Sequence, residues 1–311
     1  MQVAESVRII ELHLPFQDTP ILNVYVIKGE TSSAVIDTGM GDAASNELLL
    51  TEIRKFGTPK AQLIINTHEH IEHISGNYAL RAATGARVIA HPIAAEIIEN
   101  PTRQLGREDM LENLPEEAAS QLKRWGEFFS MIKPTRVDRK VEDGDVIELG
   151  GTRLKVVYTP GHAKGHICLY DEERRTLFSG DHVLGSGTPY VGQWPDGSNG
   201  NMTDYINSLK KLRKLDMKLI LPSHGPIVTE PYKRIDETIE RKLKREEAII
   251  EILEKGGTRD IWSLTKEVYN CSSSDAYYYS SCVLAYLSKL RDEGKAEYSI
   301  KGFDILCKLK K

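Results

Sequence analysis

The sequence contains no apolar run that approaches the roughly 20 residues needed to cross a membrane. Its start, MQVAESVR, has neither the basic stretch nor the apolar stretch of a secretion signal. Cysteine is scarce, and the four residues lie far apart with no CxxC pair (Cys168, Cys271, Cys282 and Cys307). This usage is typical of reduced, mostly buried thiols. We therefore expect a cytoplasmic protein without a membrane partner.

A strong excess of charge of either sign is also missing. The chain carries 41 Lys and Arg against 45 Asp and Glu, a formal net charge of −4, which argues against wholesale coating of nucleic acid. Residues 232–311 hold 16 basic against 14 acidic side chains, and the preceding 231 residues hold 25 against 31. The small C-terminal basic excess would suit a polyanion partner, but a solvated charged helix gives the same count.

What the sequence does contain is an alternation of strand and helix patterns over 311 residues, 40% of them hydrophobic. Apolar and β-branched runs bounded by glycine or proline predict strands at 6–14, 21–28, 33–36, 63–66, 87–90, 141–149, 153–158, 167–170, 176–178 and 218–221. Amphipathic patterns predict helices at 42–56, 76–84, 92–99 and 203–215, the last capped by Thr203. This alternation predicts a layered α/β core.

Two long segments lie between the predicted core strands. Residues 102–133 are charged and helical, with a break at Pro115, and they either form one wall of a substrate cleft or pack on the surface. Gly185–Gly200 is rich in glycine and proline, and we interpret it as an ordered loop near the functional site.

The character of the chain changes after Pro231. Apolar residues at helical spacing predict a long helix up to Gly256, then helices at 259–268 and 275–291 and a hairpin at 296–299 and 303–308. Three helices and a hairpin are the plan of a winged helix-turn-helix module. We therefore predict two domains, a larger one over residues 1–231 and a winged-helix-like one over residues 232–311.

A dense group of potential metal ligands follows the apolar run at 63–65. Within six residues the chain places His68, His70, Glu72 and His73. Neutral imidazole and carboxylate are the ligand types that zinc and similar divalent ions prefer. A strand that stops at Asn66 would deliver these side chains to its C-terminal end, where α/β sheets build sites. The alternative is a polar loop with ordinary surface histidines.

Further candidates follow the ends of other predicted strands, so all of them could converge on one edge of the sheet: Asp37, His162, Asp181 and His224. The order Asp37, His68-x-His70-x-Glu72-His73, His162, Asp181, His224 resembles the metallo-β-lactamase superfamily, over roughly residues 6 to 230. The resemblance implies an αββα sandwich with a dinuclear metal site, so the segment 1–231 would be a catalytic domain.

The resemblance also implies a role for each residue. The ligands divide between a first metal (His68, His70 and His162) and a second (Glu72, His73 and His224), with Asp181 bridging the two ions and Asp37 beside the site. Zinc is expected, with manganese or iron as alternatives. Two such ions lower the pKa of a shared water and stabilise the developing negative charge. Glu72 and Asp181 would then be the catalytic carboxylates.

Glu72 departs from the superfamily pattern, which has aspartate at this position. Glutamate reaches about 1.5 Å further, whereas metal–oxygen distances tolerate only a few tenths of an ångström. Glu72 could ligate from a shifted backbone, leave the second site weak, or swing away from it. We expect ligation with reduced affinity for the second metal.

The remaining histidines are expected outside the ligand set. We expect His166, His182 and His91 to pack beside core strands or to support the ligands without binding metal. His13 is interpreted as a surface residue of a strand, and Cys168 as a core residue.

Two motifs narrow the choice within the superfamily. Thr159–His166 looks like the branch that includes glyoxalase II, whereas Ser179–Gly185 with the C-terminal module looks like the β-lactamase-like-protein-2 group, which includes endoribonucleases acting on single-stranded RNA. Aromatic and basic residues of the third C-terminal helix could stack on bases and contact phosphates, or merely pack a small core (Tyr277, Tyr278, Tyr279, Tyr286, Lys289 and Arg291).

Three functions follow from these patterns. The first is a metal-dependent hydrolase in which a metal-bridging water cleaves single-stranded RNA phosphodiesters. The second is a hydrolase of small-molecule thioesters or lactones of the glyoxalase II type, which the acidic catalytic domain favours because it would not attract a polyanion. The third is a nucleic-acid-binding protein with a weakened hydrolase site. Oligomeric state and the physiological substrate are left open.

Overall fold

The computed structural model describes residues 2–16, 19–56, 62–104, 132–301 and 304–310, and within them the strands form three sheets. A seven-stranded sheet has its strands in chain order: β1 (Gln2–Ala4), β2 (Val7–His13), β3 (Ile21–Lys28), β4 (Ser33–Ile36), β5 (Leu63–Ile65), β6 (Arg87–Ala90) and β7 (Arg139–Lys140). The pairs up to β3–β4 are antiparallel, and those from β4–β5 to β6–β7 are parallel.

The second sheet has five strands in the order β12-β11-β10-β9-β8: β8 (Val146–Glu148), β9 (Arg153–Tyr158), β10 (Ile167–Asp171), β11 (Thr176–Gly180) and β12 (Leu219–Pro222). Only β11 and β12 are parallel neighbours. The connection between them is long enough to contain helix α6 (Met202–Leu212), as a parallel crossover requires.

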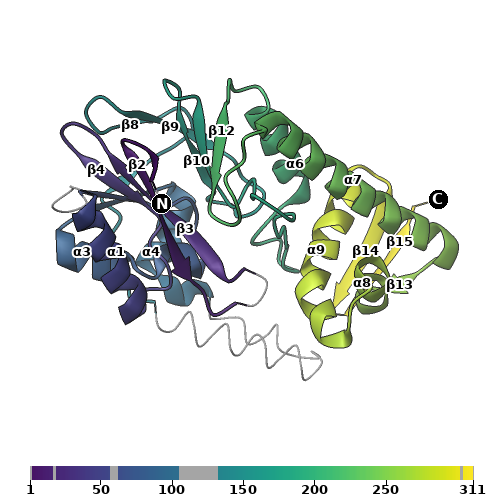
Figure 1. Ribbon diagram of the computed structural model, residues 1–311. Helices are drawn as coiled ribbons and strands as arrows, with labels where there is room; N and C mark the ends of the chain where they lie inside the picture. The colour runs from purple at the N-terminus through teal and green to yellow at the C-terminus, as the bar shows by residue number, and fades with distance from the viewer. Residues whose placement is uncertain (1, 17–18, 57–61, 105–131, 302–303, 311) are drawn as a thin grey trace.

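Helices cover the outer faces of both sheets, which gives the layers αββα (Figure 1). The outer face of the first sheet carries α1 (Ala43–Lys55), α3 (Asn77–Thr84) and α4 (Pro92–Glu99), and shorter turns are α2 (Ile71–Ile74) and η1 (Pro101–Gln104). Helix α6 and the start of α7 (Pro231–Gly256) cover the second sheet. The expected αββα sandwich is confirmed.

Strand periodicity explains how the first sheet serves two cores. In β3, Val24 and Val26 pack with the helices α1, α3 and α4, whereas Tyr25 and Ile27 face the second sheet. Successive side chains of a strand point to opposite faces, so a strand buried on both sides reads as one continuous apolar run. This is why ILNVYVIK lacks the polar alternation of a surface strand.

The C-terminal region consists of α7, α8 (Ile261–Tyr269), α9 (Ser273–Asp292) and a three-stranded sheet in the order β13-β15-β14, with β13 (Arg259–Asp260), β14 (Ala296–Lys301) and β15 (Asp304–Leu309). One hydrophobic cluster runs from Leu177 and Leu209 of the sandwich to Val283 and Leu287 of α9. The division into domains at residue 231 stays a prediction, and the two parts share this core.

Several local expectations change with the structure. Helix α6 is capped by Asn201, whose side chain accepts a hydrogen bond from the Asp204 amide, and not by Thr203 as predicted. The strand expected from Val141 begins only at Val146, because a turn with Gly144 at φ +86° precedes it. The helices expected around Pro115 lie outside the described residues. The four cysteines are free thiols, three of them buried.

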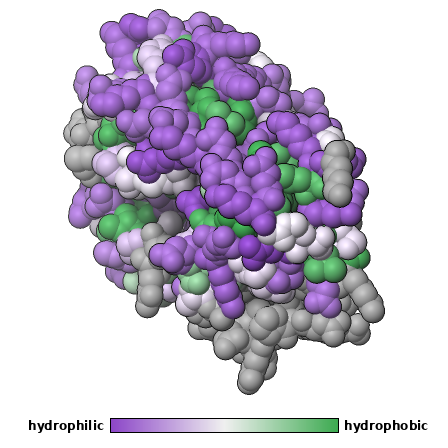
Figure 2. Space-filling view, turned by 90° about the vertical axis from the view of Figure 1, so that its right-hand side faces the viewer, coloured by the Kyte–Doolittle hydropathy of each residue, from purple (hydrophilic) through white to green (hydrophobic). Residues whose placement is uncertain are grey.

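The surface of the protein is mostly polar on the side that the C-terminal region occupies, with apolar patches separated by polar side chains (Figure 2). Within the described residues, no helix combines the length and apolar character that a membrane crossing requires.

Candidate metal centre

The predicted ligands meet at one edge of the sandwich, beyond the carboxyl ends of β4, β5, β9, β11 and β12. The histidine-rich motif divides between two local structures. His68 and His70 lie in the loop after β5, and Glu72 and His73 belong to the short helix α2, which the sequence did not predict. The turn of α2 therefore separates the motif into two groups of ligand atoms.

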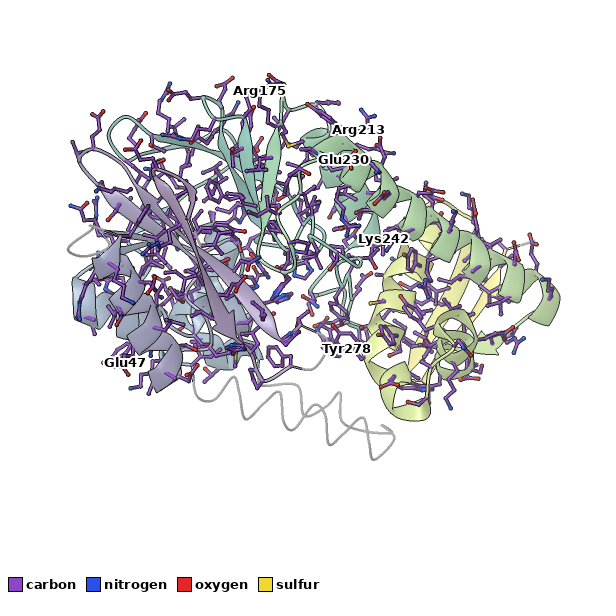
Figure 3. The ribbon with its side chains drawn as sticks, viewed as in Figure 1. Glu47, Arg175, Arg213, Glu230, Lys242 and Tyr278 are labelled. Atoms are coloured by element: carbon purple, nitrogen blue, oxygen red, sulfur yellow. The ribbon has the colours of Figure 1, made fainter. Side chains whose placement is uncertain are left out.

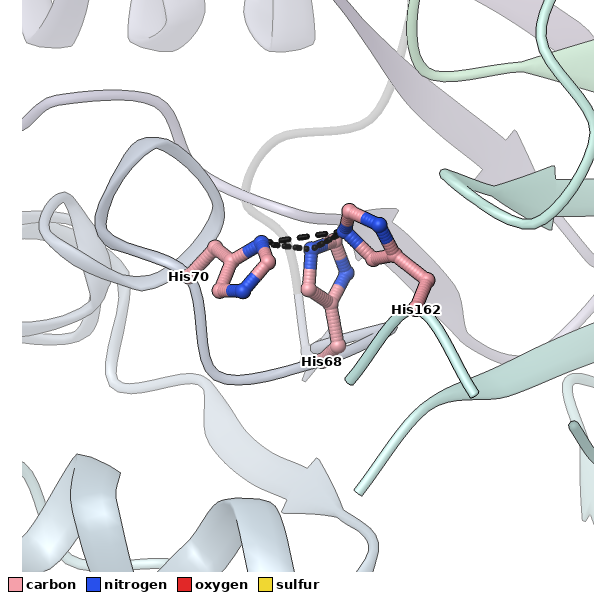
Figure 4. Close-up of side chains that lie close together, drawn as sticks. All are labelled: His68, His70 and His162. Atoms are coloured by element: carbon pink, nitrogen blue, oxygen red, sulfur yellow. Dashed lines mark hydrogen bonds between the residues drawn. The ribbon is translucent and has the colours of Figure 1, made fainter. Parts of the chain in front are cut away.

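The first group is a triangle of imidazole nitrogens. His68 Nε2 lies 3.0 Å from His70 Nδ1 and 3.2 Å from His162 Nε2, and the remaining side is 3.0 Å (Figure 4). Burial, followed by the nearby His70 ring, lowers the pKa of His162 to about 3. A neutral imidazole keeps a lone pair on the ring nitrogen that lacks the proton, and the three nitrogens of the triangle lie close enough to donate to one cation.

The second group is Glu72, His73, Asp181 and His224, whose potential ligand atoms all lie within 4.8 Å of one another. Glu72 Oε1 is 3.9 Å from His73 Nε2, so this carboxylate points into the group and does not swing away. Glu72 lies in the first turn of α2, next to His73.

Asp181 lies between the two groups. Its Oδ2 is 3.7 Å from His162 Nε2 and 3.5 Å from His224 Nε2, and its Oδ1 is 3.7 Å from His73 Nε2. Burial raises the pKa of this carboxyl, but His224 and His73 outweigh that effect and hold the pKa well below its ordinary value. The side chain is thus a carboxylate that faces both clusters, as a bridging ligand would.

Asp37 fixes the orientation of ligands in both groups. Its Oδ2 lies 2.8 Å from His73 Nδ1 and accepts a 2.9 Å hydrogen bond from Thr67 Oγ1, while Oδ1 accepts one from the Thr67 amide. Since the Thr67 hydroxyl donates to Asp37, its oxygen accepts from His68 Nδ1 at 2.9 Å. Both histidines therefore carry their proton on Nδ1 and expose Nε2 to the site.

The other two Nε2 ligands are oriented by backbone carbonyls. His162 Nδ1 donates to the Tyr190 carbonyl at 2.6 Å, and His224 Nδ1 donates to the Ile21 carbonyl at 2.7 Å. Sequence reasoning gave no role to Thr67, Tyr190 or Ile21. The only sequence feature that pointed to Thr67 is its position directly before His68 in the motif. A backbone carbonyl acceptor cannot be predicted from residue type, because every residue has one.

The donor set suits two divalent ions. Ligands at 2.0–2.1 Å around a tetrahedral zinc are roughly 3.3 Å apart, close to the separations in the histidine triangle. His73 Nε2 and Asp181 Oδ1 are buried without a hydrogen-bond partner, which is costly unless a cation binds them. Imidazole and carboxylate together accept zinc, manganese and iron, so the identity of the metal stays a prediction.

The non-ligand histidines lie mostly as expected. His166 Nε2 accepts a hydrogen bond from the Asp181 amide at 3.2 Å, so it supports the central carboxylate. The His182 ring is buried against Tyr205, and His91 caps α4. His13 is exposed, and Cys168 lies in the core.

Comparisons with known proteins agree with this geometry. The family model of the metallo-beta-lactamase superfamily matches residues 20–224, about two thirds of the chain. The chain belongs to the metallo-β-lactamase superfamily. With the two ligand clusters in place, it is a metal-dependent hydrolase of the metallo-β-lactamase fold.

Individual relatives are distant. The chain is 26% identical over 249 residues to a beta-lactamase-like protein 2 homolog of Caenorhabditis elegans, covering 79% of this chain and 70% of the relative. It is 29% identical over 222 residues to the acyl-coenzyme A thioesterase MBLAC2 of Homo sapiens, covering 65% and 72%. A metallo-beta-lactamase family protein from Thermus thermophilus has the same fold, with a TM-score of 0.83, 23% identity and coverage of 99% and 100%.

A substitution at Glu72 tests how this metallo-β-lactamase site tolerates glutamate. Because aspartate is the family's ligand at this position, Glu72→Asp is expected to raise the affinity for a second metal about tenfold, equivalent to roughly 1.4 kcal/mol, and to raise the turnover rate. Metal content per chain and initial rates at limiting metal check this. If both values equal those of the native protein, glutamate does not weaken the site.

Proposed function

We propose that this hydrolase cleaves acyl thioesters. The observation that carries the proposal is the similarity to a named acyl-coenzyme A thioesterase over 65% of the chain. The same relation supports the second sequence-based function better than RNA cleavage. Lactones share the attacked carbonyl group and remain a related candidate substrate.

The site residues would bind two metals, with His68, His70 and His162 at the first and Glu72, His73 and His224 at the second. Bound metals supply Lewis acidity and a water of lowered pKa. Glu72 and Asp181, whose carboxylates belong to the second cluster, would also accept hydrogen bonds from the attacking water and orient it toward the carbonyl carbon. A thiol with a pKa of about 8.5 leaves as thiolate near neutral pH, so thioester cleavage needs no strong proton donor.

Several of the side chains expected to hold RNA make internal contacts, although Tyr278 and Arg291 are exposed. Tyr279 stacks on Tyr269, with ring centroids 4.3 Å apart, and Tyr286 is buried. Lys289 forms ion pairs with Glu246 and Glu293. The Tyr277 side chain lies outside the described residues. The element order still resembles a winged helix, but a nucleic-acid-binding role and an RNA substrate stay predictions without support in these contacts.

The decisive assay compares both substrates on the same metal-loaded protein. Release of free thiol from acyl-coenzyme A esters of increasing chain length is expected, and His70→Ala and a chelator should each abolish it. Labelled single-stranded RNA should stay intact. RNA cleavage that requires His70, without thiol release, would reverse the choice between the two functions.

The free, mostly buried thiols are in keeping with a reducing compartment, so we also propose that the enzyme is cytoplasmic. Fractionation of native cells with an antibody against the protein checks this proposal. Recovery with secreted material or membranes would contradict it.

A further inference from the structure

The segment from Leu184 to Gln193 links the metal centre to the C-terminal region. It follows Asp181 and carries the Tyr190 carbonyl, which accepts a hydrogen bond from His162 Nδ1. Within this segment the structure shows no helix or regular strand, only an isolated bridge between Gln193 and Asn199. Its position therefore depends on contacts with other elements.

Helix α7 holds this segment through two cationic side chains. Arg234 Nε donates to the Leu184 carbonyl at 2.8 Å, and its terminal nitrogen donates to the Gly187 carbonyl. Lys242 Nζ donates to the Pro189 carbonyl at 2.6 Å. The two cations are only 8% and 7% exposed, and Figure 3 places Lys242 on α7. Buried cations bound to backbone carbonyls make strong, directional hydrogen bonds.

Helix α9 holds the same segment from a second direction. The Tyr190 hydroxyl and Ser281 Oγ are 2.6 Å apart, and the Gln193 amide donates to the Ser281 carbonyl at 3.0 Å. The ring of Tyr278 packs on that of Tyr190, with centroids 4.6 Å apart and 30° between the planes. Figure 3 shows Tyr278 where α9 meets the loops of the sandwich.

We propose that α7 and α9 position His162 as a metal ligand through the Tyr190 carbonyl, so that the C-terminal region sets the metal affinity of the histidine triangle. The path has three steps. Lys242 and Ser281 hold Pro189 and Tyr190 in place, and the Tyr190 carbonyl accepts a hydrogen bond from Nδ1 of His162. This hydrogen bond orients the ring so that Nε2 of His162 faces the metal position. Partners that orient ligating histidines affect metal affinity about 10- to 100-fold. The inference rests on the metal centre and not on the substrate.

The alternative is that these contacts only pack the C-terminal region against the sandwich. If the contacts only provide packing, a substitution that removes one of them should lower the free energy of unfolding and leave the metal affinity unchanged. A buried tyrosine of α9 provides the matched control for Tyr190→Phe. Tyr286 is buried in α9, and among the described residues its hydroxyl makes no hydrogen bond to the segment from Leu184 to Gln193. Tyr286→Phe therefore removes a tyrosine hydroxyl without changing the path.

The test measures cobalt and zinc affinity by chelator competition on the full chain, beside urea unfolding in excess chelator. Tyr190→Phe and Lys242→Met are each expected to weaken binding of one metal about 3- to 10-fold. They should also change the visible absorption of the cobalt form, while Tyr286→Phe leaves both unchanged. Native metal affinity in Tyr190→Phe and in a folded Lys242→Met would overturn the proposal. So would equal weakening in Tyr286→Phe. Should Lys242→Met fail to fold, Tyr190→Phe alone decides.

Discussion

Replacing Asp181 with asparagine is expected to remove nearly all hydrolysis and to leave less than two metals per chain. The carboxylate lies within 3.5–3.7 Å of three histidine nitrogens from both clusters, so the substitution removes one negative charge from the centre of the site. A neutral amide is a poorer ligand, and its NH₂ group would face an imidazole lone pair. Losing several kcal/mol of transition-state stabilisation lowers the rate on the order of 10³-fold.

Metal analysis and the kinetics of hydrolysis of the proposed thioester substrate, on the same preparation, check this expectation. Asp236→Asn is the matched control, because Asp236 is half-exposed on α7 and pairs with Arg213 at the surface. Such exposed pairs contribute little to stability, so the control should keep native metal content and rate. An Asp181→Asn protein with two metals and a near-native rate would show that this carboxylate does not bridge the clusters.

The second large effect is expected at Asp37, where stability and metal binding can be separated. The side chain is fully buried and connects Thr67 and His73 through three hydrogen bonds. Asp37→Ala leaves these groups without partners and places alanine at φ +63°, a conformation that disfavours it. We expect a loss of about 3–5 kcal/mol in the free energy of unfolding.

Asp37→Asn should keep more of the stability, since asparagine tolerates positive φ and its oxygen can still accept from the Thr67 amide. Its NH₂ group, however, would take the place of Oδ2 and donate toward His73 and Thr67. Both His73 and His68 would then be driven to the tautomer with the proton on Nε2, which faces the metals. We expect metal affinity to fall about 10- to 100-fold.

Urea unfolding in chelator and metal titration separate the two effects. The expected pattern is a large stability loss in Asp37→Ala only and weak metal binding in both variants. Native metal affinity in Asp37→Asn would contradict the assigned tautomers. A stability of Asp37→Ala within about 1 kcal/mol of the native value would show that Thr67 and His73 find other partners.

The order of elements could be read largely from local sequence. Periodicity and glycine or proline boundaries placed β2 to β6, α1 and α7 within a few residues, because each apolar pattern reports the face that its own segment buries. The short helix α2 was missed, since four residues carry too little periodicity. The Asn201 cap was missed because Thr203, two residues later, offers the same kind of side chain.

The sequence also determined which side chains meet at the metal centre. The potential ligands lie in the loops and the short helix that follow strands, and strand ends at one edge of a sandwich are neighbours. The motif order then led to the metallo-β-lactamase superfamily, which the family model supports over residues 20–224. The substrate was not determined in this way, because thioester and phosphodiester hydrolysis can use the same ligands.

Only the tertiary structure decided the details that control those ligands. Tyr190 and His162 are 28 residues apart, and their contact depends on a loop whose position is set by α7 and α9. The tyrosines of α9 have the composition of a base-stacking surface, yet Tyr278 packs on the loop and Tyr286 is buried. Composition is a property of one segment, whereas the residues that a side chain contacts depend on how distant segments pack together. For that reason the sequence specified the metal chemistry, and the fold decided which groups support it.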